Sequence, residues 1–226
     1  ALFIAGWTPC PHRSPRAQSG TVLYSTEKPG TGISVVSTGS IPHQDLSLLN
    51  HILEGNVMTN WNGRALVDGD WLAEHIDDPD LRIIDATVVM TRSDSGTWSP
   101  SSGRGAFEKA HIPGAQFIDL RQELQDKTSP FGLMLAKPDD FAQAMSEKGI
   151  GDDHMVVVYA AAVPWWASRM WWMLKANGHD KVAVLDGGLQ KWTDEGRALT
   201  IELPALLPAT FTAKQRPEMI ADKAQV

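Results

Sequence analysis

The sequence contains few side chains that could act as nucleophiles or metal ligands. Its one cysteine, Cys10, lies between prolines in WTPCPHRS, where the neighbouring His12 and Arg13 favour the thiolate form. We interpret this thiol as incidental, because the surrounding sequence predicts no strand–loop–helix unit. A single cysteine excludes an internal disulfide and a multi-cysteine metal site. The seven histidines form no HExxH-like pair, so we predict neither a bound metal nor a cofactor.

The stretch VVVYAAAVPWWASRMWW (156–172) predicts a strand, a short loop and a tryptophan-rich helix. In a parallel α/β domain, catalytic loops lie at such junctions, beyond the carboxyl end of a strand. The loop residues here carry no nucleophilic side chain and are Ala160, Ala161, Ala162, Val163, Pro164 and Trp165. We therefore predict the architecture of an active site without a nucleophile.

Short apolar runs alternate with amphipathic segments from about residue 65 onward. The expected strands are 81–86, 115–120, 155–160 and 181–186. The expected helices are 71–76, with Asp68 or Asp70 as its N-cap, then 106–110, 138–150, 166–176 and 187–196. The strands are continuous apolar runs without two-residue alternation, which is typical of a parallel sheet covered by helices on both faces. The Ser- and Gly-rich stretch 91–105 is expected to be a loop.

The chain divides into three parts. Residues 1–57, rich in Ser, Thr, Gly and Pro, are predicted to be a disordered leader or an extension upstream of a true start at Met58. A cytoplasmic location is expected, with a mitochondrial one as the alternative if this acid-poor stretch is a transit peptide. Residues 58–200 are predicted to form one α/β domain. Residues 201–226 are predicted to be a linker, a strand-like ATFTA (209–213) and the truncated start of a second domain.

Composition excludes some classes of partner. A hydrophobic content of 42% and a charged content of 21% are ordinary for a globular protein. The net charge of −7 disfavours nucleic acid and anionic membranes, since both require a basic surface. No apolar run approaches the length of about 18 residues that a membrane span requires.

Three separated motifs carry a resemblance to a known family. FEKAHIPGAQFI (107–118) runs into one expected strand, IIDA (83–86) ends another, and VAVLDGGLQKW (182–192) joins a strand to a helix. Together they resemble the rhodanese family of sulfurtransferases over about residues 65–200. The stretch 171–188 is similar to the first domain of tandem thiosulfate and 3-mercaptopyruvate sulfurtransferases. The resemblance implies a rhodanese-like parallel sheet of about five strands with helices on both faces. The motif residues with expected structural roles are Asp85, His111, Pro113, Gly114, Asp186, Gly187, Gly188 and Trp192.

Each motif also has a physical interpretation. The proline–glycine pair of HIPGA predicts a turn into the sheet. The glycine pair of LDGG allows a sharp exit from a strand and close packing of the next helix. We expect His111 and Asp85 to form a hydrogen-bonded pair that ties a loop to a strand end. The clustered tryptophans are expected in the core or at a domain interface and are Trp165, Trp166, Trp171 and Trp172.

The resemblance also has consequences for catalysis. In active rhodanese-like domains a cysteine ends the central strand, and the loop after it lowers the thiol pKa and stabilises a persulfide. Ala160 stands at that cysteine, and Pro164 removes one possible amide donor. The resemblance therefore assigns catalysis to a second rhodanese-like domain of the same polypeptide, with a small sulfur-donor anion at the interface. The resemblance places Arg121 and Leu133 where the mercaptopyruvate branch has an aspartate and a histidine. The apolar residue at the second of these positions is more like thiosulfate sulfurtransferases and favours thiosulfate as donor. Asp119 is expected to cap a strand end.

Two functions remain open at this point. The first is the non-catalytic N-terminal domain of a tandem sulfurtransferase that moves sulfur from thiosulfate or 3-mercaptopyruvate to a thiophilic acceptor such as cyanide. The second is a stand-alone, catalytically inactive rhodanese domain that acts as a protein-binding or regulatory module. A phosphatase of the related Cdc25-like fold is excluded, because Arg169 is not accompanied by a cysteine and a phosphate-binding loop.

Overall fold

The computed structural model describes residues 21–26, 35–40, 61–221 and 225. The chain forms two compact units, Ala1–Thr59 and Asn60–Val226. In the first unit, β1 (Thr21–Thr26) and β2 (Val35–Ser40) pair in antiparallel fashion. Cys10 and Met58 lie outside the described residues, so the interpretation of residues 1–57 as a leader stays a prediction.

The second unit is built on a five-stranded sheet with the order β3-β9-β8-β4-β7, and all its neighbouring strands are parallel. The strands are β3 (Leu66–Val67), β4 (Leu81–Asp85), β7 (Ala115–Phe117), β8 (Met155–Tyr159) and β9 (Val182–Leu185). The α/β fold with about five parallel strands is therefore confirmed. The edge strand β3 was not predicted, because two residues are too few to show a pattern.

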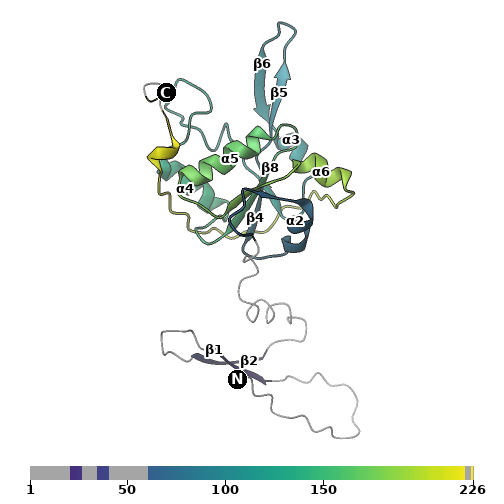
Figure 1. Ribbon diagram of the computed structural model, residues 1–226, viewed down its shortest axis with the longest axis vertical. Coiled ribbons are helices and arrows are strands. Elements are labelled where there is room, and N and C mark those ends of the chain that lie inside the picture. Colours follow the sequence, from purple (N-terminus) through teal and green to yellow (C-terminus); the bar gives the residue numbers. More distant parts are fainter. Residues whose placement is uncertain (1–20, 27–34, 41–60, 222–224, 226) are drawn as a thin grey trace. The chain divides into compact units, whose positions relative to one another are not determined.

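Helices connect these strands, as Figure 1 shows. They are α2 (Gly69–His75), α3 (Arg104–Phe107), α4 (Pro138–Glu147), α5 (Trp165–Ala176) and α6 (Gly188–Asp194), and a 3-10 turn (Pro217–Met219) follows. The side chain of Asp68 accepts a hydrogen bond from the amide of Trp71 at 2.8 Å and so caps α2. Within the described part of the chain, no helix is long and apolar enough to cross a membrane.

The strand side chains alternate between two buried layers. Ile84 of β4 and Val156 and Val158 of β8 belong to the cluster that α4 and α5 cover. Leu72 of α2 and Trp192 of α6 are also buried but lie outside that cluster, against the other face. All five residues of β8 are buried, which is why the central strand is a continuous apolar run.

The stretch after β4 differs from the expected loop. β5 (Val88–Arg92) and β6 (Trp98–Ser102) pair as an antiparallel hairpin that projects from the domain in Figure 1. Its turn is closed by two backbone bonds, from the Ser93 amide to the Thr97 oxygen and from the Gly96 amide to the Ser93 oxygen, both 2.9 Å long. The prediction of a loop over 91–105 was wrong, because serine-rich strands with little burial lack an apolar pattern.

Residues 200–219 pack on the same domain. Phe211 is 5% exposed, makes an edge-on contact with Phe141 of α4, and donates its amide to the Ser146 hydroxyl at 3.0 Å. Arg216 makes two hydrogen bonds to the Asp180 carboxylate, at 2.9 and 2.6 Å. The prediction of a strand over ATFTA (209–213) was wrong. The Phe211 amide bonds to a helix side chain instead of pairing with a strand. The packing of this domain thus extends beyond residue 200.

Candidate functional site

The loop after β8 begins at the carboxyl edge of the sheet, with Ala160 at the position expected for a cysteine. Ala160 is 7% exposed and belongs to the buried cluster under α5. The loop amides are partly used inside the domain. The amide of Ala161 donates to the Thr87 hydroxyl oxygen at 2.8 Å, the amide of Trp166 donates to the Val163 oxygen at 3.3 Å, and proline at 164 has no amide hydrogen.

Asp85, at the end of β4, holds Thr87 in the orientation that this loop requires. The Asp85 carboxylate accepts the Thr87 amide at 2.8 Å and also the Thr87 hydroxyl, whose oxygen in turn accepts the Ala161 amide. Burial raises the pKa of Asp85, although hydrogen bonds from Thr87 and Tyr159 oppose that shift. Asp85 therefore fixes the loop, through Thr87, to the end of the neighbouring strand β4.

A cavity of about 140 Å³ lies beside the loop. Its walls come from the loop, α5, β9 and the start of α6, and they are Ala160, Ala161, Ala162, Pro164, Ala167, Val184, Leu185, Gly187, Gly188 and Gln190. Gln190 supplies the one polar side chain of this lining, and none of the lining side chains is charged. The cavity therefore offers neither a nucleophile nor a charged partner for a sulfur-donor anion.

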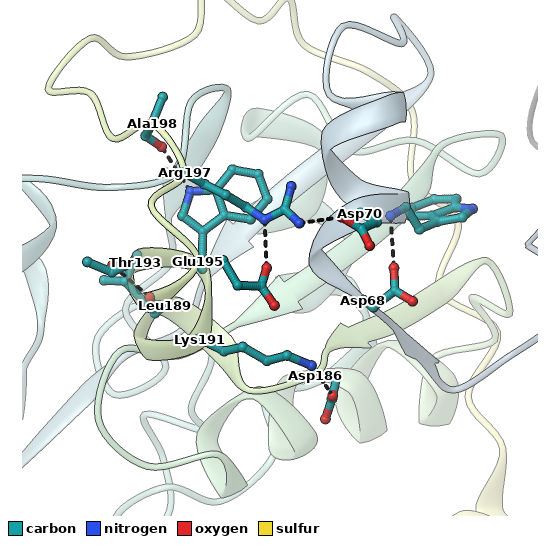
Figure 2. Close-up of polar contacts among 11 residues, drawn as sticks. Asp68, Asp70, Asp186, Leu189, Lys191, Thr193, Glu195, Arg197 and Ala198 are labelled. Atoms are coloured by element: carbon teal, nitrogen blue, oxygen red, sulfur yellow. Dashed lines mark hydrogen bonds and ion pairs between the residues drawn. The ribbon is translucent and has the colours of Figure 1, made fainter.

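The two glycines of LDGG bring α6 against Ala160. Gly187 and Gly188 have φ angles of +75° and +55°, and a Cβ on Gly188 would lie 2.6 Å from the Ala160 oxygen. Glycine is therefore required for this close approach. Asp186, which precedes the pair, makes an ion pair with Lys191 at 2.8 Å (Figure 2).

The same region joins α6 to α2. Arg197 makes ion pairs with Asp70 at 2.5 Å and with Glu195 at 2.7 Å, as Figure 2 shows. Its guanidinium carbon lies 5.2 Å from the centre of the Trp192 ring, and the Trp192 indole donates to the Ala198 oxygen at 2.8 Å. Trp192 therefore packs under Arg197 and anchors the chain that follows α6.

His111 does not form the expected hydrogen bond with Asp85. Its Nδ1 contacts the Phe107 oxygen at 2.8 Å, and its Nε2 contacts the Glu202 oxygen at 3.1 Å. The ring also stacks on Phe107 with centroids 3.9 Å apart. Because His111 follows Phe107 by four residues, it lies next to that carbonyl and ties α3 to the chain at residue 202. The turn after it is as expected, with Gly114 at a φ of +76°.

The residues at the two assisting positions also have structural contacts. The Arg121 guanidinium donates to the Pro100 oxygen at 2.6 Å, and Leu133 has a φ of +63°. Asp119 accepts the amides of Arg121 and Gln122 at 3.0 and 3.1 Å, which agrees with the predicted cap. In the described part of the chain, no group of three or more His, Cys, Asp and Glu side chains could hold a metal ion.

Sequence reasoning gave Arg169 no role, yet the structure places it beside the Leu133 oxygen, to which its guanidinium donates. Among the clustered tryptophans, Trp166 is buried in the core, whereas Trp165 is 59% exposed. Only the folded chain brings Arg169 next to a loop 36 residues away.

Comparison with known proteins agrees with this geometry. The model of the family described as "Rhodanese-like domain" matches residues 68–195. The chain is 38% identical over 171 residues to a 3-mercaptopyruvate sulfurtransferase of Escherichia coli. This match covers 74% of this chain and 56% of that protein. It is 37% identical over 161 residues to a thiosulfate sulfurtransferase of Gallus gallus, with coverage of 67% and 52%.

The fold comparison gives the same result. The structure matches SseA, a 3-mercaptopyruvate sulfotransferase of Escherichia coli with the rhodanese fold, at a TM-score of 0.62 and 36% identity. The match covers 71% of this chain and 59% of that one. The chain spans about half the length of the curated relatives it matches. These similarities and the parallel sheet with its strand–loop–helix junction show that the chain belongs to the rhodanese family.

Proposed function

We propose that this chain acts in sulfur transfer as the non-catalytic N-terminal rhodanese-like domain of a tandem sulfurtransferase. A second rhodanese-like domain supplies the cysteine that receives sulfur from thiosulfate or 3-mercaptopyruvate and passes it to a thiophilic acceptor. The observation that carries the proposal is Ala160 at the end of β8, where an active domain requires a thiol.

The surroundings of Ala160 support a positional role for this domain. The cavity is uncharged, and the Ala161 amide already donates a hydrogen bond to Thr87. The loop is therefore poorly suited to hold an anion or a persulfide. The relatives that the chain matches over about half their length include 3-mercaptopyruvate and thiosulfate sulfurtransferases. Leu133, an apolar residue at one assisting position, favours thiosulfate over 3-mercaptopyruvate as the donor.

The chain itself provides the first test. Purified residues 1–226 should form no thiocyanate from thiosulfate and cyanide, and no pyruvate from 3-mercaptopyruvate. The gene is then read beyond codon 226, where the proposal requires an open frame that encodes a second rhodanese-like segment with a cysteine-containing loop. Turnover by the purified chain would refute the non-catalytic role, and a stop codon would refute the tandem arrangement.

One observation fits the second candidate as well, a stand-alone inactive rhodanese domain that binds a protein partner. Large apolar side chains are exposed in the segments that follow β4, β7 and β8, and they are Trp98, Phe131, Met134 and Trp165. The carboxyl ends of parallel strands meet at one edge of a sheet, so these segments share an edge. A stop codon after residue 226 would favour this candidate over the tandem arrangement.

A further inference from the structure

Arg169 is a half-buried cation without a carboxylate partner among the residues that the structure describes. Its guanidinium donates to the Leu133 oxygen, while its buried Nε has no hydrogen-bond acceptor in that part of the chain. Burial lowers the pKa of Arg169, and no acidic side chain offsets the shift. A desolvated guanidinium of this kind gains energy from any carboxylate that reaches it.

The residues around Arg169 are apolar. Trp165 precedes it by one helical turn on the same face of α5, and the Trp172 ring centre lies 5.8 Å from the guanidinium carbon on the next turn. The Leu133 oxygen joins this helix to a loop whose Phe131 and Met134 side chains are 71% and 49% exposed. An exposed apolar rim around an unpaired cation is the composition of a protein-binding surface.

We propose that Phe131, Met134, Trp165 and Arg169 form a docking face that accepts an aspartate or glutamate flanked by apolar side chains. This Arg169 face binds such a segment of the second rhodanese-like domain, so the inference rests on the proposed function. We choose this partner by charge complementarity. Its carboxylate would pair with Arg169, and its apolar side chains would cover the exposed Phe131, Met134 and Trp165. A partner segment rich in Lys or Arg would leave the guanidinium unpaired.

A random peptide library displayed on phage tests this chemistry directly on the full chain. The net charge of −7 attracts basic peptides nonspecifically, so enrichment of acidic ones is discriminating. We expect selected peptides to carry Asp or Glu beside Leu, Phe or Trp. Arg169→Gln should weaken their binding at least tenfold, whereas Arg64→Gln, which removes the same charge from an exposed position, should leave it unchanged.

A second variant covers the case in which Arg169→Gln perturbs folding. Trp165→Glu changes an exposed side chain and places a carboxylate four residues before Arg169, where it competes with the peptide. It should also weaken binding at least tenfold while the near-ultraviolet circular dichroism keeps its folded signature.

Three outcomes would overturn the docking face. The first is selection of basic or uncharged peptides, and the second is selection of acidic peptides that bind both variants as tightly as the parent chain. The third is a saturable shift of the Arg169 Nε–H resonance by millimolar thiosulfate when the library yields no acidic peptides. The last would make Arg169 a small-oxyanion site. None of these readouts involves sulfur transfer, so failure of the docking face is distinct from failure of the proposed function.

Discussion

Replacing Ala160 with cysteine tests whether this loop can still support the family's chemistry. The variant is made in a Cys10→Ser background, so that the new thiol is the only one in the chain. Ala160 belongs to the buried cluster and also lines the uncharged cavity of about 140 Å³. The Ala161 amide beside it donates a hydrogen bond to the Thr87 hydroxyl oxygen. We therefore expect a thiol whose pKa stays at or above its ordinary value.

The size of the effect follows from the ionised fraction. A thiol with a pKa of about 8.5 is about 10% thiolate at about pH 7.5, and one with a pKa of about 7 is about 75% thiolate. The difference of about 1.5 units corresponds to about 2 kcal/mol of thiolate stabilisation that the loop does not supply. The cysteine variant should therefore hold at least about sevenfold less thiolate than a catalytic loop at this pH.

The pH dependence of iodoacetamide alkylation measures this pKa, with the Cys10→Ser chain as the unreactive control. Thiosulfate and cyanide are then supplied to both chains, and thiocyanate is followed with time. We expect an alkylation midpoint at or above about pH 8.5 and no thiocyanate above the control. A midpoint below about pH 7, or steady thiocyanate production, would refute our reasoning that the loop has lost its anion-stabilising groups.

Four further predictions concern stability, each measured by urea unfolding. Phe211→Ala should lower the free energy of unfolding by about 3 to 5 kcal/mol, because this residue is buried against α4; a loss below about 1 kcal/mol would show that the C-terminal segment is not part of the fold. Gly188→Ala should cost more than Gly63→Ala, because both have positive φ but only the first places a Cβ 2.6 Å from a backbone oxygen; equal losses would leave only the left-handed strain of about 1 to 2 kcal/mol. Burial raises the pKa of Asp85, so its contribution to stability should fall as pH rises from about 4 through the folded value, and Asp85→Asn should remove that fall. Ion pairing lowers the pKa of Asp180, so its contribution is present above about pH 4 and is lost as pH falls, and Asp180→Asn should change the acid side of the profile instead. An unchanged pH profile in either variant would contradict the corresponding assignment.

Much of the site could be predicted from local sequence. The apolar run 156–159 predicted the central strand, and the alanine after it predicted the missing thiol without any structure. The partner of His111 could not be predicted in this way. Its Nε2 reaches an oxygen 91 residues further along the chain, and no local pattern encodes that approach.

The sequence alone determined the alternation of strands and helices, the family and the absence of a nucleophile at residue 160, because these depend on residue identity and short-range pattern. Tertiary structure decided how Thr87 uses the Ala161 amide, where Phe211 packs, and that Arg169 is left without a carboxylate in the described part of the chain. Each of these depends on distances between segments far apart in the sequence. Such distances are set by the packing of the whole domain.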